Sequence, residues 1–168
     1  MNKKGQYYLV AAIILAGIAL SIATIANYAK KQSTTDLTNL REEIQIEGAR
    51  TLDYCLNNNF DFSSTNSIFQ DLASRYIAKD SRDTDLYFLF GTEDNMTLKG
   101  YQKSAHDVSL DNTQVTSSKG VFVGSVNPKT NMTVTIDNNV YVFNLKTGEN
   151  FYFLLAREQG EGQYIIQG

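Results

Sequence analysis

The most prominent pattern in the chain is a long uncharged apolar stretch near the N-terminus. Residues Tyr7 to Ala26 form a run of twenty without a charge, and beyond its opening tyrosines only Ser21 and Thr24 are polar. A helix of that length is about 30 Å long, close to the thickness of a bilayer's hydrocarbon core. A core helix of a globular domain normally has polar residues on its outer face. The stretch therefore predicts a membrane-spanning helix.

A pattern with a helical period follows the apolar stretch. Apolar or small residues recur at intervals of three and four, with charged residues mostly on the other face: Leu37, Leu40, Ile44, Gly48, Leu52 and Cys55. This pattern predicts an amphipathic helix that ends at the turn-forming residues 57–59. A helix continuous from Gln6 to Leu56 would be about 75 Å long. The alternative is a break between Gln32 and Asp36, where Ser33 and Asp36 match a capping box.

The remaining chain predicts one short helix and then strands. The helix is predicted to begin near Ser67. Its inward-facing side chains are predicted to be Ile68, Phe69, Leu72, Tyr76 and Ile77. From Asp83 onward, short apolar or alternating segments separated by polar turns predict strands at residues 86–90, 96–102, 121–123, 132–136, 140–145, 151–156 and 164–166. Asn138-Asn139 predicts a hairpin turn, and the nearly all-apolar segment 151–156 predicts a central strand. Residues 102–119 are polar and predict a surface loop or a weak strand around Val108 and Leu110.

These patterns together predict an α+β fold. Its elements are a long N-terminal helix, with a membrane-spanning first half, and a short helix packed on an antiparallel β-meander.

Charge is unevenly distributed along the chain. No acidic residue precedes Asp36, whereas four of the 15 basic residues, Lys3, Lys4, Lys30 and Lys31, flank the apolar stretch. From Gln32 onward there are 11 basic and 18 acidic residues, a net charge of −7. A domain this acidic repels phosphate backbones, so we expect no nucleic-acid partner.

The residues that commonly carry chemistry are few and scattered. The single histidine, His106, lies in the polar stretch and is expected to be solvent-exposed, and the single cysteine, Cys55, lies on the apolar stripe and is expected to be a core residue. Asp80, Asp83 and Asp85 lack the glycine and distal glutamate of a calcium loop, so solvated acids are the better interpretation. We therefore expect no catalytic residue, no metal ligand, no cofactor and no enzymatic activity.

Two N-x-[ST] triplets bear on topology. Asn95-Met96-Thr97 and Asn131-Met132-Thr133 are acceptor sequences for N-glycosylation, which takes place outside the cytoplasm. The lysines on either side of the apolar stretch are balanced, so the positive-inside rule does not decide the orientation. The triplets favour a domain outside the cell, with Asn95 and Asn131 accessible there. The alternative is that both are unmodified turn residues.

The most specific motif in the sequence lies in the first eight residues, Met-Asn-Lys-Lys-Gly-Gln-Tyr-Tyr. They resemble the class III signal peptide of type IV pilin-like proteins, in particular the archaeal pilins with a Lys-Gly-Gln junction. The resemblance implies that a prepilin peptidase cuts between Gly5 and Gln6 and leaves the apolar helix on the mature chain. It covers about thirty residues. The glutamate that bacterial pilins carry five residues into the mature chain is replaced by Val10, which argues against the bacterial branch.

The resemblance implies a structural role. The domain organisation would be a leader at residues 1–5, a transmembrane helix with its flank at 6–31, and an extracytoplasmic α+β domain at 32–168. The chain would be a filament subunit at the cell surface that associates with itself or with other pilins. Four alanines spaced 4, 3 and 4 apart, Ala12, Ala16, Ala19 and Ala23, form a strip along which neighbouring helices could approach closely.

Other interpretations of the N-terminus compete with this one. The apolar stretch could be an uncleaved anchor, or a secretory signal cut after Ala23 to release a protein that starts at Thr24. Two alternatives to a filament subunit are a membrane-tethered binding module and a minor pilin of a secretion or adhesion system.

The competing interpretations differ in the mature N-terminus. We expect N-terminal sequencing to give Gln6, because Gly5 lies between the lysines and the apolar stretch. Gly5→Val should leave the precursor uncut but inserted, since a β-branched side chain obstructs close approach without lowering hydrophobicity. A mature chain that starts at Thr24 would rule out the pilin-like interpretation, and an intact Met1 would leave a simple anchor.

Overall fold

The computed structural model describes residues 3–80, 84–127, 131–159 and 162–168, and their side chains except in segments 3–11, 26–35, 80 and 158–167. The chain divides into two compact units, residues 1–39 and 40–168. In its described part, the fold consists of two helices and two antiparallel sheets, which confirms the predicted α+β class.

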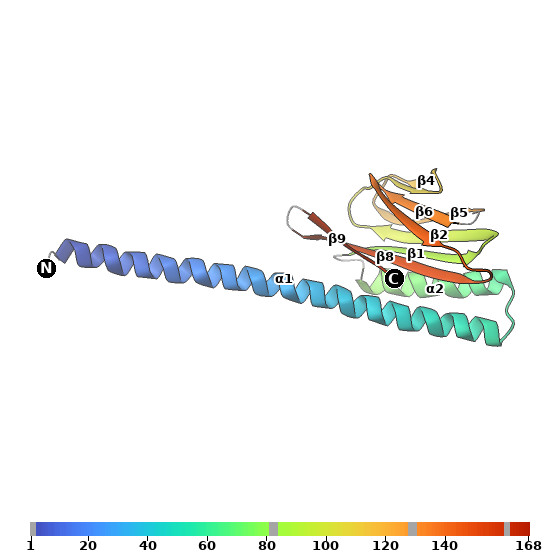
Figure 1. The fold of residues 1–168 in the computed structure, drawn as a ribbon, viewed down its shortest axis with the longest axis horizontal. Coiled ribbons are helices and arrows are strands. Elements are labelled where there is room, and N and C mark those ends of the chain that lie inside the picture. Colours follow the sequence, from blue (N-terminus) through green and yellow to red (C-terminus); the bar gives the residue numbers. More distant parts are fainter. Residues whose placement is uncertain (1–2, 81–83, 128–130, 160–161) are drawn as a thin grey trace. The chain divides into compact units, whose positions relative to one another are not determined.

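Helix α1 spans Lys3–Asn57 (Figure 1). Its helical backbone continues through residues 32–36, so the capping-box pattern there does not start a new helix. The predicted stripe holds: Leu37, Leu40, Ile44, Gly48 and Cys55 are buried, and Leu52 is half-buried. Spacing by three and four residues was therefore a reliable guide to the buried face.

Helix α2 spans Phe62–Asp80 and begins earlier than the predicted start near Ser67. The reason is a cap that the apolar pattern does not reveal: the Asp61 carboxylate accepts a hydrogen bond from the Ser64 backbone amide at 2.9 Å. The helix buries Phe69, Leu72, Tyr76 and Ile77 as predicted, while Ile68 is only half-buried.

The larger sheet has the strand order β5-β2-β1-β8-β9. Its strands, in chain order, are β1 (Asp85–Thr92), β2 (Asn95–Gln102), β5 (Gly120–Val126), β8 (Asn150–Gln159) and β9 (Gly162–Gln167). The segment 151–156, predicted as a central strand, lies in β8, an interior strand between β1 and β9; the central strand of the sheet is β1.

The smaller sheet has the strand order β4-β3-β6-β7. Its strands are β3 (Val108–Leu110), β4 (Thr113–Thr116), β6 (Asn131–Ile136) and β7 (Asn139–Asn144). The β6–β7 turn is one residue earlier than predicted: Ile136 pairs with Asn139, and Asp137 has the positive φ of 51°. The polar stretch 102–119 contributes β3 and β4, because Val108 and Leu110 are buried.

The prediction of a single β-meander is wrong. After the β1–β2 hairpin the chain forms β3 and β4 of the smaller sheet and then β5 of the larger sheet, which pairs with β2. It next forms β6 and β7 of the smaller sheet and finally β8 of the larger sheet, which pairs with β1. The physical reason lies in β1, whose residues 85–91 are all buried. Both of its faces must be covered, and a single sheet with helices on one face would leave the other face in water.

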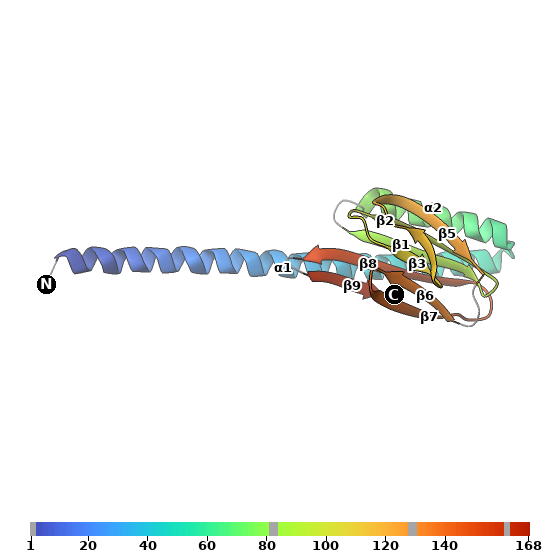
Figure 2. The same ribbon diagram turned by 90° about the horizontal axis from the view of Figure 1, so that it is seen from above.

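The helices cover one face of the larger sheet. Within residues 40–168, α2 and the last turns of α1 lie on the same side of β1 and β2 (Figures 1 and 2). Phe69 of α2 stacks on Phe90 and Phe151 with ring centroids 5.7 and 5.0 Å apart, and Tyr76 lies 6.1 Å from Phe88. The Lys99 ammonium on β2 donates to the Gln70 carbonyl and the Ser74 hydroxyl of α2 at 3.2 and 2.7 Å.

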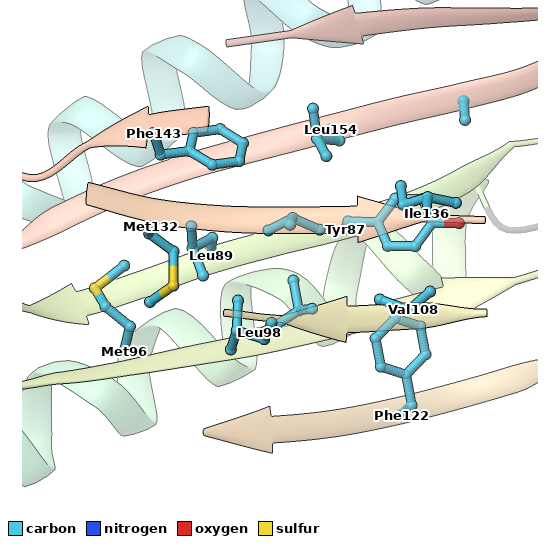
Figure 3. Close-up of a cluster of buried hydrophobic side chains, with 13 residues drawn as sticks. Tyr87, Leu89, Met96, Leu98, Val108, Phe122, Met132, Ile136, Phe143 and Leu154 are labelled. Atoms are coloured by element: carbon cyan, nitrogen blue, oxygen red, sulfur yellow. The ribbon is translucent and has the colours of Figure 1, made fainter. Parts of the chain in front are cut away.

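The smaller sheet covers the opposite face. Side chains from both sheets meet in one hydrophobic cluster, drawn in Figure 3. The larger sheet contributes Tyr87, Leu89, Met96, Leu98, Phe122, Leu154 and Ala156, and the smaller one contributes Val108, Leu110, Met132, Val134, Ile136 and Phe143. In β6 the burial alternates residue by residue, as the sequence predicts.

Close packing at Gly48 provides a test of the helical layer. A Cβ atom at this position of α1 would overlap the ring of Phe151, which stacks on Phe69. We expect Gly48→Leu to lower the free energy of unfolding by roughly 1–3 kcal/mol, because an overpacked core must displace the ring. The measurement is thermal unfolding of the full chain in detergent, followed by tyrosine circular dichroism.

The matched control is Gln45→Leu, which places the same side chain on the exposed face of α1. Its unfolding free energy should stay within about 0.5 kcal/mol of the original. Equal melting temperatures for the two variants would show that Gly48 is not a packing constraint.

Candidate functional site

The surface feature that most needs an explanation is the apolar stretch of α1 in the first unit. Its large aliphatic side chains are 52–70% exposed: Ile13, Ile14, Leu15, Ile18, Leu20, Ile22 and Ile25. Soluble proteins rarely present a contiguous apolar surface of this extent unless something binds to it. The described side chains of this stretch therefore form the candidate functional surface.

The four alanines of the predicted seam lie within this surface. Ala12, Ala16, Ala19 and Ala23 are all exposed. At about 100° per residue they fall in a sector of roughly 60° on one side of the helix. The large isoleucines lie mainly on other sides, so the alanines form a shallow strip between bulkier side chains.

A second face of small residues was missed in the sequence analysis. Gly17, Ser21 and Thr24 share a sector roughly 140° away from the alanines. The Ser21 hydroxyl donates to the Gly17 carbonyl at 2.8 Å, and the Thr24 hydroxyl donates to the Leu20 carbonyl at 2.9 Å. Both hydroxyls are thereby satisfied within the helix, which lowers the cost of placing them in an apolar environment. Their spacing of four and three residues could have revealed this face.

The predicted processing site lies outside the residues whose side chains are described. Gly5 and Gln6 fall within the bounds of α1. Over the described residues, no helix combines the length and the hydropathy of a membrane span.

The two sequon asparagines differ in their surroundings. Asn95 begins β2 and is half-buried, and the Thr97 hydroxyl of its triplet is buried 3.2 Å from the Ser125 hydroxyl. Asn131 begins β6 and is exposed, on the rim of a polar hollow of about 520 Å³. The Thr133 hydroxyl of that triplet donates to Asp111 at 3.0 Å. Asn131 is therefore the more accessible of the two acceptors.

The prediction that His106 is solvent-exposed is wrong. Its side chain is only 16% exposed and lies between two carboxylates. Its Nδ1 is 2.8 Å from the Asp137 carboxylate in the β6–β7 turn, and its Nε2 is 3.6 Å from Asp85 on β1. The histidine therefore links the larger sheet to a turn of the smaller one, a long-range contact that residue spacing could not predict.

The expectation of solvated acids is also wrong for Asp85. This residue is buried, and its carboxylate accepts a hydrogen bond from the Lys103 backbone amide at 2.7 Å. The side chains of Asp80 and Asp83 lie outside the described residues. Among the residues that the structure describes, no cluster of histidine, cysteine and acidic side chains could hold a metal ion.

Cys55 is a buried, free cysteine, which confirms that it is a core residue. Burial raises the pKa of its thiol, and a hydrogen bond with Thr65 partly offsets that rise. The thiol borders a hollow of about 310 Å³, lined by Cys55, Leu56, Asn59, Phe60, Thr65 and Glu149. A high thiol pKa disfavours the reactive thiolate, so this arrangement does not suit nucleophilic catalysis.

Glu149 is a polar residue of this hollow whose carboxyl group lies in an unfavourable environment. Its Oε2 is buried and has no hydrogen-bond partner among the described residues. Burial, together with the nearby charge of Glu93, raises the pKa of the Glu149 carboxyl. The carboxylate is thus held in an environment that favours its protonated form.

Comparisons with known proteins identify no relative: no protein-family model, no curated protein and no solved structure matches the chain.

The raised pKa of Glu149 predicts how stability depends on pH. Because the folded chain holds this proton more tightly than the unfolded chain, its contribution is favourable below the ordinary glutamate pKa and is lost as the pH rises through the folded value. We expect Glu149→Gln to raise the melting temperature at pH 7, because the amide removes the cost of ionising a buried carboxyl. The gain should shrink towards pH 4, and an equal gain at both pH values would contradict this origin.

Proposed function

We propose that this chain is a pilin-like structural subunit of a surface filament. In this proposal the N-terminal apolar helix anchors the subunit in a membrane before assembly and packs with copies of itself afterwards. The α+β domain lies outside the cell and forms the outer layer of the filament.

The observation that carries the proposal is the exposed apolar surface of α1 between residues 12 and 25. Seven large aliphatic side chains are each at least half exposed, and burying such a side chain fully is worth roughly 1.5–3 kcal/mol. Covering them would therefore release on the order of 10 kcal/mol. A helix that is apolar on all sides requires either lipid or other helices around it.

The polar groups of the stretch support lipid as the first environment. Ser21 and Thr24 hydrogen-bond to backbone carbonyls four residues earlier, so neither hydroxyl needs water. The uncharged run from Tyr7 to Ala26 matches the thickness of a bilayer.

The small residues support helices as the second environment. Lipid chains pack equally well against large and small side chains, whereas neighbouring helices approach closely only where side chains are small. The alanine strip and the Gly17 face lie on different sides of α1, so one helix could contact two neighbours. A filament core, in which each helix is surrounded by others, uses such an arrangement.

Processing and location follow from the resemblance of the N-terminus. The Lys-Lys-Gly-Gln junction would make a prepilin peptidase a transient partner. The proposed location is the cell membrane, crossed once, with the C-terminal domain outside and a surface filament as the final assembly. Asn95 and Asn131 would then be on the side of the membrane where glycans are added.

A membrane-tethered binding module is the second candidate function. The polar hollow of about 520 Å³ beside Asn131 favours it, because such a concavity could receive a small polar ligand. A minor pilin that initiates an assembly would combine the two functions.

Three consecutive positions of α1 test the proposal, since residues 16, 17 and 18 point in directions about 100° apart. Each is changed to leucine in the full chain. All three variants should insert normally, measured by resistance to alkaline extraction, because leucine is apolar. Ala16→Leu should abolish or strongly reduce sheared filaments and Gly17→Leu should reduce them, because added bulk separates neighbouring helices.

The matched control is Ile18→Leu, which gives the same side chain without added volume and should assemble normally. If Ala16→Leu, Ala12→Leu and Ala19→Leu all form unchanged filaments, the alanine seam is wrong. If the original chain never leaves the membrane fraction for any assembly, the tethered binding module is the better account.

A further inference from the structure

The charge of the chain is separated between its two units. Residues 1–39 contain four lysines and one acidic residue, a net charge of +3. Residues 40–168 contain eleven basic and seventeen acidic residues, a net charge of −6. After the proposed cut at Gly5, the first unit keeps Lys30, Lys31 and Asp36, a net side-chain charge of +1. Two copies of the second unit therefore repel each other, whereas the Lys30–Lys31 segment of one copy attracts the second unit of another.

The outer face of α1 in the second unit carries a regular row of exposed residues. Glu42, Ile46, Ala49, Asp53 and Leu56 recur at intervals of four and three, so they lie along one side of the helix. Ile46 and Leu56 are 52% and 60% exposed. The row lies opposite the buried stripe that includes Ile44, Gly48 and Cys55, so it faces away from the domain's own core.

The acidic members of this row are Glu42 and Asp53. Neither Glu42 nor Asp53 forms an ion pair with any residue that the structure describes, and both are exposed. Glu43, one position away from Glu42, differs: it accepts a hydrogen bond from Lys79 at 2.8 Å. Arg41, next to Glu42, and Arg50, three positions before Asp53, are the basic residues of this part of the helix.

We propose that this row, Glu42, Ile46, Ala49, Asp53 and Leu56, is a docking surface for the Lys30–Lys31 segment of a second copy. The inference rests on the proposed assembly and names the partner of its outer layer. Lys30 and Lys31 are the basic residues of the first unit that remain after the proposed cut at Gly5. Glu42 and Asp53 supply the complementary charge, and Ile46 and Leu56 supply apolar area.

A carbodiimide tests this contact directly, because it joins a carboxylate to an amine without a spacer. Two full-length chains with different epitope tags are produced together, and the reaction is run on membranes and on sheared filaments. After the reaction the proteins are denatured and captured through one tag. Any captured material that also carries the other tag contains a covalent link between two copies. We expect mass spectrometry to place links between Lys30 or Lys31 and Glu42 or Asp53.

Charge exchange provides the second readout. Glu42→Lys with Asp53→Lys should lower the filament yield by roughly tenfold, because like charges now face each other. Lys30→Glu with Lys31→Glu should do the same, and combining all four changes should restore most of the yield. The matched control, Asp71→Lys with Asp94→Lys, makes the same change in net charge at exposed positions elsewhere and should assemble normally.

The outcomes separate this inference from the proposed function. Filaments without the expected links, or without rescue by the fourfold exchange, would overturn the docking surface and leave the filament subunit standing. Links between copies in membranes of cells that never form filaments would overturn the filament and support the docking surface. Neither links nor filaments would overturn both.

Discussion

The requirement that both faces of strand β1 be covered determines the architecture of the second unit. Residues 85–91 are all buried, so the strand can exist only between two layers. Phe69 and Tyr76 of α2 provide aromatic cover on one face. The smaller sheet provides the other layer, and because its strands are inserted between β2 and β8 in the chain, the larger sheet must be assembled from segments far apart in sequence.

Helix α1 has two kinds of surface along its length. In the second unit, one stripe is buried and the opposite row is exposed, as in any amphipathic helix at the surface of a domain. Between residues 12 and 25 the described side chains are exposed on every side although most are aliphatic. An amphipathic helix can be completed by its own domain, whereas a helix that is apolar all round needs an external environment. This difference is the basis for proposing a role in assembly.

The polar groups in the interior of the domain hold turns and layers in place. His106 lies between Asp85 and Asp137 and links the two sheets. Asn150 accepts from the Lys146 amide and donates to the carbonyls of Lys146 and Gly148, each at 2.8 Å, which closes the turn before β8. The hydrogen bonds of Asn150 satisfy buried polar atoms that would otherwise destabilise the fold. They account for the positions of the polar residues without assigning them any chemistry on a substrate.

The sequence by itself determined the features that depend on neighbours within one or two turns of chain. The stripe from Leu37 to Cys55 and the alternation in β6 were predictable, because helical and strand periods place such residues on one face. The same helical period places Ala12, Ala16, Ala19 and Ala23 on one side of α1. The Asp61 cap and the Gly17–Ser21–Thr24 face are local too, because their hydrogen bonds join residues three or four positions apart.

Only the tertiary structure decided which segments meet across long distances. The division into two sheets follows from the need to cover β1 twice, and no local pattern states which strand pairs with which. The partners of His106 lie 21 positions before it, at Asp85, and 31 positions after it, at Asp137. Contacts of this kind arise from the packing of layers, whose free energy depends on the whole core and is not encoded in the spacing of any single segment.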